Sequence, residues 1–538
     1  MIRLDLSDLQ GNIHRPYGRF GFPHTRHLFF VIHEPLAGRR FVQGVRPRVT
    51  TAEPWLRSEA PDGKSVIEKP TITLNIGFTY QALRALGLPT ETLRLLPEEF
   101  IDGMSCRADI LGDVGSSAPE RWDPAWRGEP HPAHVWVSLN VGQNPDGTPL
   151  PILDEWTDWL LGLVEKSAGG VTLLEGHGAD GAGRWQDSAA LMAEQPDGTR
   201  VPIPKEHFQF TDGITDPVFR GQFAPDAEAL ASIGGGKLAE GRYDENKSWG
   251  PLAAGEFILG QVDEGQEFPV ATEPRAFVRN GSFMVWRKLH QNVEVFEDYV
   301  RAQAAVWLKV YPKATQEEAE ETIRAKIVGR WRSGIPLSTA PDWAEHQRLM
   351  EAYADCIELT LRKPRDSKEE QRLAQYVKLL SAFRYGDDPD GAKCPLGSHI
   401  RRANPRDMLD PLVSDTHGAS TLVNRRRILR RGLPYVDPNG ERGVVFMAIC
   451  ASLFRQFEFV QQQWMNYGLD FEAGNDTCPL IGSRAQSDKH VIPTGDKDAA
   501  PFIAGGLPDF VTTRGGDYFF LPSINAIRMI AMGTTDPT

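Results

Sequence analysis

The stretch HLFFVIH, residues 27–33, is rich in aromatic and β-branched side chains, which predicts a β-strand. Three more segments have the same character: TITLNIGF (71–78), HVWVSLNVG (134–142) and SFMVWRKL (282–289). Helical patterns lie between these segments, but strands and helices do not alternate strictly. This order favours an α+β fold with antiparallel sheets over a doubly wound parallel fold.

Two longer patterns predict helices. The first begins with a Thr-x-x-Glu capping box, Thr315 to Glu318, and continues to residue 331. In the second, the buried strand VVFMAIC (444–450) runs into a helix over residues 452–466. An α-helical period places four of its apolar residues on one face: Leu453, Phe457, Val460 and Trp464.

Composition excludes several classes of protein. The chain has 538 residues and a formal net charge of −13, which argues against a nucleic-acid-binding surface. No apolar run approaches a membrane span and the N-terminus lacks a signal pattern, so we expect no membrane association and a cytoplasmic location. The five scattered cysteines form no CxxC or CxxCH, so reduced thiols are expected rather than a zinc ribbon or covalently attached haem. No GxGxxG follows a predicted strand and opens a helix, and no GxxxxGK[ST] occurs. Nicotinamide and nucleoside-triphosphate chemistry are therefore unsupported.

Three short segments carry candidate chemistry, and the first is EHFQFTDGITDPVF (206–219). Asp212 lies there between Thr211 and Gly213, among aromatic residues. Asp-Gly and Asp-Pro pairs are common in turns, so a structural turn is the simpler interpretation. The functional alternative is a carboxylate held at a sharp turn against apolar surface, which would suit a proton acceptor.

The second segment, CPLGSHIRRANPRD (394–407), holds one histidine, His399, in front of a block of arginines. A lone histidine is more often structural than a ligand. One axial histidine can nevertheless hold a haem iron, because the porphyrin supplies four nitrogens. A zinc site would need Cys394 together with two distant ligands, and the spacing gives no support for it.

The third segment, NRRRILRRGLPYV (424–436), contains five arginines. A solvated basic face is one interpretation. Because apolar residues such as Ile428 and Leu429 are interleaved, we expect at least one arginine to point inward. A buried arginine needs an anionic partner, which here would be a carboxylate, a haem propionate or a bound peroxide.

Together these segments resemble the dye-decolorising peroxidases. LDLSDLQGNI near the start is similar to that family's LxDLQGNI, and FTDGITDP to its GxxDG stretch. CPLGSHIRRANPRD is similar to CPxGAHIRRxNPR, and NRRRILRRGLPY to RILRRGxPYG. The likeness runs over most of the chain. The length, NGSFMVWRKLHQNV and GEFILGQVDE resemble the longer, prokaryotic branch (class C-like) of the family.

The resemblance implies a haem b (iron protoporphyrin IX) peroxidase that reduces hydrogen peroxide and oxidises dyes, phenolics or similar one-electron donors. The implied fold is of the dimeric α+β barrel type. It has two ferredoxin-like modules, residues 1–205 and 206–538, each with an antiparallel sheet and peripheral helices, and the haem lies mostly in the second. Assembly into a homo-oligomer is left open.

The same resemblance assigns roles to residues. His399 is the proximal ligand of the haem iron, Asp212 the distal aspartate and Arg430 the distal arginine. Arg430 is preferred by register over Arg425–Arg427 and Arg431. Arg406 is a candidate partner of the haem propionates. Further cofactor contacts are expected from Gly213, Ile214 and Phe446.

Two departures from the family pattern bear on activity. The first glycine of GxxDG is here Gln209, and the glutamine of Ile-Ser-Gln-Pro is Asp216; a side chain at 209 is expected to narrow or polarise the haem edge. Cys478 stands where the family has an aspartate that orients the proximal histidine, with Asp476 two residues earlier. Two alternatives follow: a haem-binding or haem-handling protein with little turnover, and a non-haem scaffold in which Asp212 and Arg430 form a structural ion pair.

Overall fold

An antiparallel sheet, whose strands do not lie in chain order, forms the centre of the described structure. The computed structural model describes residues 4–59, 65–128, 132–238, 249–269, 271–361, 365–410, 419–494 and 499–536. Eight strands follow one another across the sheet in the order β13 (Leu429–Arg430), β15 (Arg442–Cys450), β12 (Ser282–Gln291), β18 (Val511–Leu521), β4 (Ile72–Phe78), β5 (Val135–Val141), β1 (His24–Ile32) and β6 (Val171–Leu173). Two more strands attach to this path: β14 (Pro434–Val436) pairs with β15, and β7 (Gln186–Ala189) with β1.

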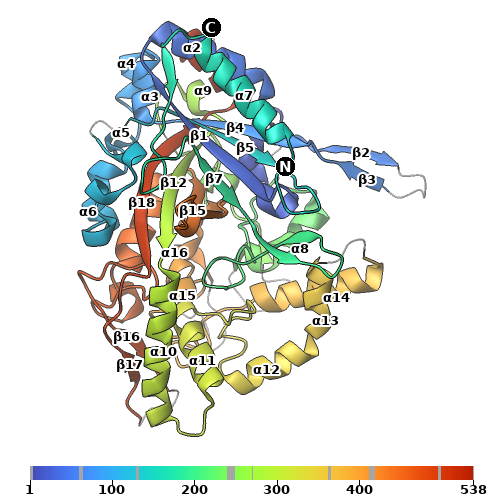
Figure 1. Ribbon diagram of the computed structural model, residues 1–538, viewed down its shortest axis with the longest axis vertical. Coiled ribbons are helices and arrows are strands. Elements are labelled where there is room, and N and C mark those ends of the chain that lie inside the picture. The colour runs from blue at the N-terminus through green and yellow to red at the C-terminus, as the bar shows by residue number, and fades with distance from the viewer. Residues whose placement is uncertain are drawn as a thin grey trace.

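The four strands that open the sequence analysis are all present, as β1, β4, β5 and β12. Every residue of β4 and β5 is buried, because both faces of the sheet are covered in this half of the molecule. Figure 1 shows helices α2 (Pro35–Val45) and α7 (Ile152–Glu165) over this end of the sheet. The predicted α+β architecture with antiparallel pairing is confirmed.

The sheet has two halves that meet at one residue pair. Strands β1, β4 and β5 form one half, and β12, β15 and β18 form the other. The halves are joined where Phe520 of β18 pairs with Phe78 of β4. The last helix, α17 (Ile524–Met532), then returns to pack against α2. The division at residue 205 stays a prediction, since one sheet runs across both parts.

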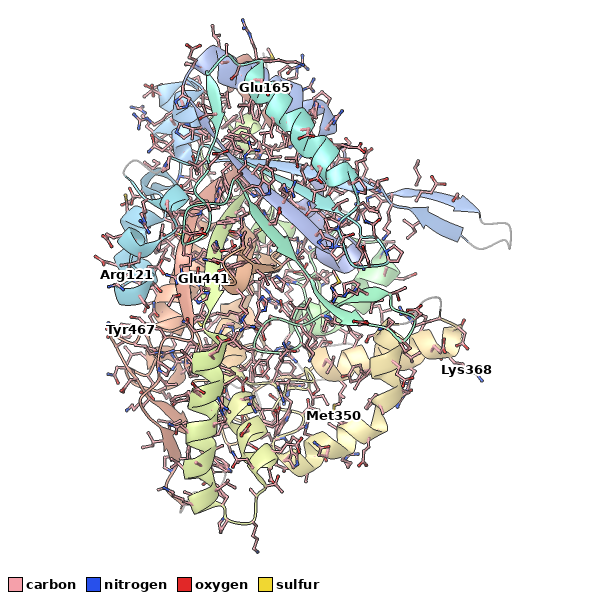
Figure 2. All side chains as sticks on the ribbon, in the orientation of Figure 1. Arg121, Glu165, Met350, Lys368, Glu441 and Tyr467 are labelled. Atoms are coloured by element: carbon pink, nitrogen blue, oxygen red, sulfur yellow. The ribbon has the colours of Figure 1, made fainter. Side chains whose placement is uncertain are left out.

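Helices gather at the opposite end of the molecule from α2 and α7 (Figure 1). They are α10 (Val293–Val310), α11 (Gln316–Val328), α12 (Trp343–Ala352), α13 (Ala354–Leu361) and α14 (Ser367–Ser381). Thr315 caps α11 by accepting a hydrogen bond from the Glu318 amide at 3.1 Å, which is one half of the predicted capping box. Figure 2 shows Lys368 at the outer end of α14. No helix among the described residues is both long and apolar enough to cross a bilayer.

The helix predicted over residues 452–466 is a π-helix, in two consecutive segments η8 (Leu453–Glu458) and η9 (Val460–Met465). Hydrogen bonds from i to i+5 widen each turn, so the α-helical period is wrong here. Trp464 turns away from Phe457 and packs instead with Val423 and Phe471. The residues that face the interior cavity follow steps of four and five: Gln456, Phe457, Val460, Gln461 and Met465.

Candidate active site

A cavity of about 880 Å³ lies against one face of the second half of the sheet. Alternate residues of three neighbouring strands form its floor: Arg287, Leu289 and Gln291 of β12, Val444 and Phe446 of β15, and Val511 and Thr513 of β18. The cavity also receives side chains from the 206–217 loop, from the π-helix and from α15 (His399–Ala403). All the residues expected to form the site line this cavity: Asp212, Gly213, Ile214, His399, Arg406, Arg430 and Phe446.

Asp212 and Arg430 form an ion pair in the cavity wall. Arg430 is placed by β13, which pairs with β15, while the Asp212 amide donates to the Pro204 carbonyl oxygen at 2.9 Å. Arg430 Nη2 donates to Asp212 Oδ1 at 2.5 Å, and the Gly213 amide donates to the same oxygen at 2.7 Å. The charge of Asp212 raises the pKa of Arg430 above its usual value, against the opposing effect of burial. The pair therefore places a carboxylate and a permanent cation at the same point.

Asp216 adds a second ion pair to the same loop. Its Oδ2 accepts a hydrogen bond from Arg431 Nη1 at 2.7 Å, and both side chains are largely buried. Arg431 also donates to the carbonyl oxygens of Asn12 and Ile13. The aspartate that replaces the motif glutamine therefore ties the Asp212 loop to both the 430–431 segment and the N-terminal segment.

His399 is the first residue of α15 and uses only one ring nitrogen within the described protein. Its Nδ1 lies 3.4 Å from Cys478 Sγ, whereas Nε2 has no hydrogen-bond partner among the described residues. Asp476, the other candidate partner, instead contacts Ser487 and Lys489, each at 3.4 Å. Cys478 thus occupies the position of the expected aspartate in space as well as in sequence.

The sulfur of Cys478 lies among hydrogen-bond donors. Burial acts to raise the pKa of the thiol, but the neighbouring His399 and the amides of Ile481 and Leu480 outweigh it and lower the pKa to about 7. All five cysteines are free, and four of them are buried, in keeping with the expected reduced thiols. The arrangement favours a sulfur that accepts a hydrogen bond from His399 Nδ1.

Three arginines give the cavity an excess of positive charge. Arg330 donates only to the carbonyl oxygens of Gly334 and Leu380, and Arg427 only to those of Gly235 and Gly236. Among the described residues neither forms an ion pair. Burial, and then the charge of Arg406, lower the pKa of Arg330 to about 10 and that of Arg427 to about 9. Buried cations in this state are stabilised by an anion, and the two propionates of a haem fit that requirement.

Arg406 lies beside these two cations on the segment after α15. Its Nη1 donates to the Phe383 carbonyl oxygen at 2.7 Å, and its guanidinium carbon lies 3.8 Å from the centre of the Phe383 ring. The side chain is 4 % exposed. The expected propionate partner is therefore held rigidly at the cavity wall.

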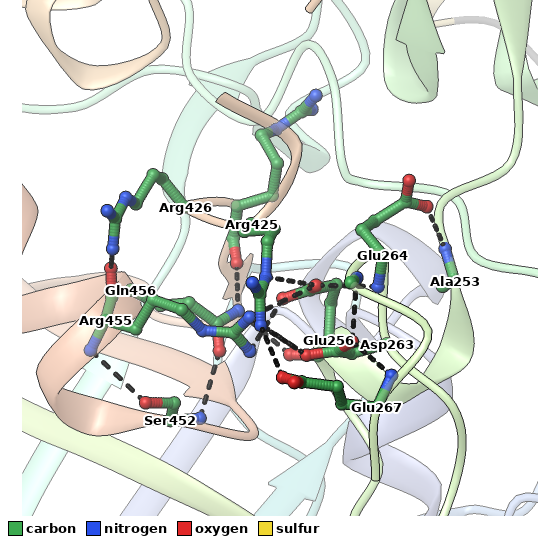
Figure 3. A network of polar contacts seen from close by, with 12 residues as sticks. Ala253, Glu256, Asp263, Glu264, Glu267, Arg425, Arg426, Ser452, Arg455 and Gln456 are labelled. Carbon is green, nitrogen blue, oxygen red and sulfur yellow. Dashed lines mark hydrogen bonds and ion pairs between the residues drawn. The ribbon is translucent and has the colours of Figure 1, made fainter. Parts of the chain in front are cut away.

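The arginines of residues 425–427 point in different directions, as Figure 3 shows for the first two. Arg425 donates to Asp263 Oδ2 at 2.8 Å, and Arg426 to the Arg455 carbonyl oxygen at 2.7 Å. These contacts fix the segment against the 253–267 loop and the π-helix, leaving Arg427 in the cavity wall. The prediction that at least one arginine of this block points inward is confirmed by Arg427 and Arg430.

Gln209 does not obstruct the site. Its side chain is exposed and is absent from the described cavity lining, so the expectation that it narrows the haem edge is wrong. The alternative of a haem-handling protein with a blocked peroxide site loses its basis. Sequence reasoning missed Arg330, because it lies outside the three segments with candidate chemistry, near the end of the predicted helix 315–331, and reaches the cavity through the turn after α11.

Gln209 has a φ of 70°, a left-handed conformation that disfavours any residue with a Cβ. Replacing it by glycine should raise the free energy of unfolding by about 0.5 kcal/mol, the difference between the relieved strain and the larger entropy of an unfolded glycine. Denaturant titration measures this change. The reaction rate with peroxide should stay as in the wild type; a clear rise or fall would place the side chain in the site after all.

Comparison with known proteins agrees with this geometry. Residues 8–138 match the DyP dimeric alpha+beta barrel domain. The chain is 28% identical to a dye-decolorizing peroxidase of Exidia glandulosa, in an alignment that covers 97% of this chain and 86% of the relative. It is 25% identical to Peroxidase 2 of Mycetinis scorodonius, over 98% of this chain and 88% of the relative. A solved dye-decolorizing peroxidase in complex with 2,6-dimethoxyphenol has the same fold, with a TM-score of 0.67, 23% identity and coverage of 98% and 100%.

Both of these curated relatives are fungal, so the expected placement in the prokaryotic branch is not supported. The likeness nevertheless spans almost the entire sequence and includes the matched domain. On these grounds the chain is similar to the dye-decolorising peroxidases over almost its whole length, and residues 8–138 match their N-terminal barrel domain.

Proposed function

We propose that this protein is a haem b peroxidase that reduces hydrogen peroxide and oxidises phenolic or dye donors. The observation that carries the proposal is the cavity in which the Asp212–Arg430 pair and an imidazole nitrogen of His399 are exposed together. The family consists of haem enzymes. Haem b, rather than a covalently attached haem, is supported by the lack of any CxxCH in the sequence.

The residues present suit a haem. His399 would ligate the iron through Nε2, because Nδ1 is engaged by Cys478. Arg330, Arg406 and Arg427 would balance the propionates. The backbone at Gly213, Ile214 and the ring of Phe446 would contact the macrocycle, in a cavity whose volume is in the range of ligand pockets.

When bound, the haem would supply the redox chemistry: it would give two electrons to hydrogen peroxide and recover them from donors one at a time. The Asp212 carboxylate would take a proton from one oxygen of hydrogen peroxide and deliver it to the other, which would leave as water when the O–O bond breaks. Arg430 holds Asp212 in place and offers a permanent charge to the departing oxygen. Asp216 and Arg431 keep the loop that carries Asp212 fixed.

Electron donors are proposed from the family. A solved relative is described as a complex with 2,6-dimethoxyphenol, which supports phenols as one class. Dyes form the second class, as the names of the relatives indicate. Purified protein supplied with haem should show a Soret band and oxidise both donor classes when hydrogen peroxide is added. Protein that takes up no haem under these conditions would overturn the proposal.

Replacing Cys478 by aspartate should lower the reduction potential of the bound haem by an amount on the order of tens of millivolts. A carboxylate accepts the Nδ1 hydrogen bond more strongly than sulfur and makes the imidazole a more electron-rich ligand. Spectroelectrochemical titration measures the potential. Cys450→Ser, at a buried cysteine of β15, is the control and should leave the potential unchanged. An unchanged or higher potential in Cys478→Asp would show that Cys478 does not govern His399.

A further inference from the structure

A tight loop, residues 204–212, carries Asp212 at its base. The Asp212 amide donates to the Pro204 carbonyl oxygen at 2.9 Å, which closes the loop. Near the tip, the Gln209 amide donates to the Glu206 carbonyl oxygen at 2.8 Å. A chain that reverses within so few residues leaves inner amide groups that no strand can pair, so these amides need acceptors from side chains.

Glu206 supplies those acceptors. Its Oε2 accepts a hydrogen bond from the Phe208 amide and its Oε1 one from the Phe210 amide, each at 2.8 Å. Its Oε2 also accepts from Nε2 of Gln291, a buried residue at the end of β12. Three N–H donors stabilise the ionised form of a carboxylate. One side chain therefore both braces the loop from within and ties it to the central sheet.

Aromatic packing holds the two residues whose amides Glu206 accepts. Phe208 and Phe210 are buried, and the centres of their rings lie 4.5 Å and 6.5 Å from that of Phe296 in α10. The packing fixes the rings, and Glu206 fixes the backbone between them. The path of the chain into Asp212 depends on both.

Glu206 also belongs to the charged group around Asp212 and Arg430, and all three residues line the cavity. Burial raises the pKa of Glu206 and the charge of Asp212 raises it further, whereas the three hydrogen bonds oppose this change. The charge of Glu206 adds to that of Asp212 in raising the pKa of Arg430. Because N–H donors engage both oxygens of Glu206, this carboxylate is directed at the loop and the strand.

We propose that Glu206 is a positioning residue, which holds the Asp212 carboxylate in the orientation needed to accept a proton from hydrogen peroxide. It acts through the backbone of the 204–212 loop, not by contact with the peroxide. A glutamine in its place has a single acceptor oxygen, so one of the two loop amides loses its partner. Misplacing a reacting group by about 1 Å can cost roughly 100-fold in rate. This inference rests on the proposed peroxidase function.

A double-mutant cycle tests whether Glu206 acts through Asp212. Stopped-flow absorbance at the Soret band gives the rate with hydrogen peroxide for four haem-loaded proteins: the wild type, Glu206→Gln, Asp212→Asn and the double variant. Glu206→Gln should slow the wild type by about 10- to 100-fold. In the Asp212→Asn background the same change should alter the rate by less than about twofold, because the group that Glu206 positions is already gone. Equal slowing in both backgrounds, or no slowing of the wild type, overturns the proposal.

Glu99→Gln is the matched control and should keep the wild-type rate. Glu99 is also a buried carboxylate whose pKa burial raises, and its Oε1 accepts the Phe454 amide at 3.0 Å. It lies outside the described lining of the cavity. Slowing by Glu99→Gln to the same degree as by Glu206→Gln overturns the assignment.

The Soret band and thermal unfolding show whether each variant is folded. If Glu206→Gln does not fold, Gln291→Leu takes its place in the cycle, because it removes the donor that ties Glu206 to β12. The same pattern is expected, and no slowing, or equal slowing in both backgrounds, overturns the proposal. A wild type without a Soret band, or without reaction with peroxide, would instead show failure of the proposed function. Asp212→Asn as fast as the wild type would overturn both.

Discussion

Changing Asp212 to asparagine should slow the reaction of the haem-loaded protein with hydrogen peroxide by about two to four orders of magnitude, the usual contribution of a positioned acid–base group. Asparagine keeps the shape of the side chain and can still accept a hydrogen bond from Arg430 Nη2. It cannot take up the peroxide proton, however. Haem content should stay near that of the wild type, because Asp212 lies in a loop separate from α15, which carries His399.

Stopped-flow absorbance at the Soret band measures this rate under pseudo-first-order peroxide. Asp216→Asn is the control, since Asp216 lies in the same loop and also pairs with an arginine. It should reduce stability, with less than about a tenfold effect on the rate. If Asp212→Asn reacted as fast as Asp216→Asn, Asp212 and Arg430 would be no more than a structural ion pair.

Replacing His399 by alanine should remove bound haem almost completely. His399 is the only histidine among the described residues that line the cavity. Losing an axial ligand is more severe than losing an outer-shell partner, which alone costs roughly 10–100-fold in affinity. The ratio of Soret to protein absorbance after reconstitution measures the loss.

Added imidazole should restore the Soret band of His399→Ala, because the small ring can fill the space of the deleted side chain. His33→Ala is the control and should retain haem, since His33 is exposed on the first half of the molecule. Full haem occupancy in His399→Ala without imidazole would contradict the assignment of the proximal ligand.

The sequence predicted the parts of this protein that depend on local pattern. Strands such as β4 and β5 are long apolar runs between turn residues, and those runs survive in the structure. The motif segments also predicted the facing pair Asp212 and Arg430, although 218 positions separate them in the chain. The predicted period of the helix at 452–466 was wrong. No residue type is specific to a π-helix, and the α-helical and π-helical periods both place Phe457 inward, so the sequence does not distinguish them.

Contacts between residues far apart in the chain could not be predicted from the sequence either. Arg330 reaches the cavity from a turn with no motif, and the contact between Cys478 and His399 depends on how two distant loops meet. The order of strands, with β18 inserted between β12 and β4, is set by packing rather than by local preference. The segment that begins at residue 112 carries no motif either, yet it supplies the buried residues Asp113, Trp122 and Trp126.

The single pairing of Phe78 with Phe520 has a consequence for biosynthesis. These residues are 442 positions apart (520 − 78), so at roughly 5–20 residues per second the ribosome needs about 20 to 90 seconds between them. During that time β4 has no neighbour on one edge and α2 lacks the cover of α17. Val511 and Thr513 of β18 belong to the cavity floor. The cavity is therefore completed only after β18 has been synthesised, and until then the N-terminal half has an unpaired sheet edge.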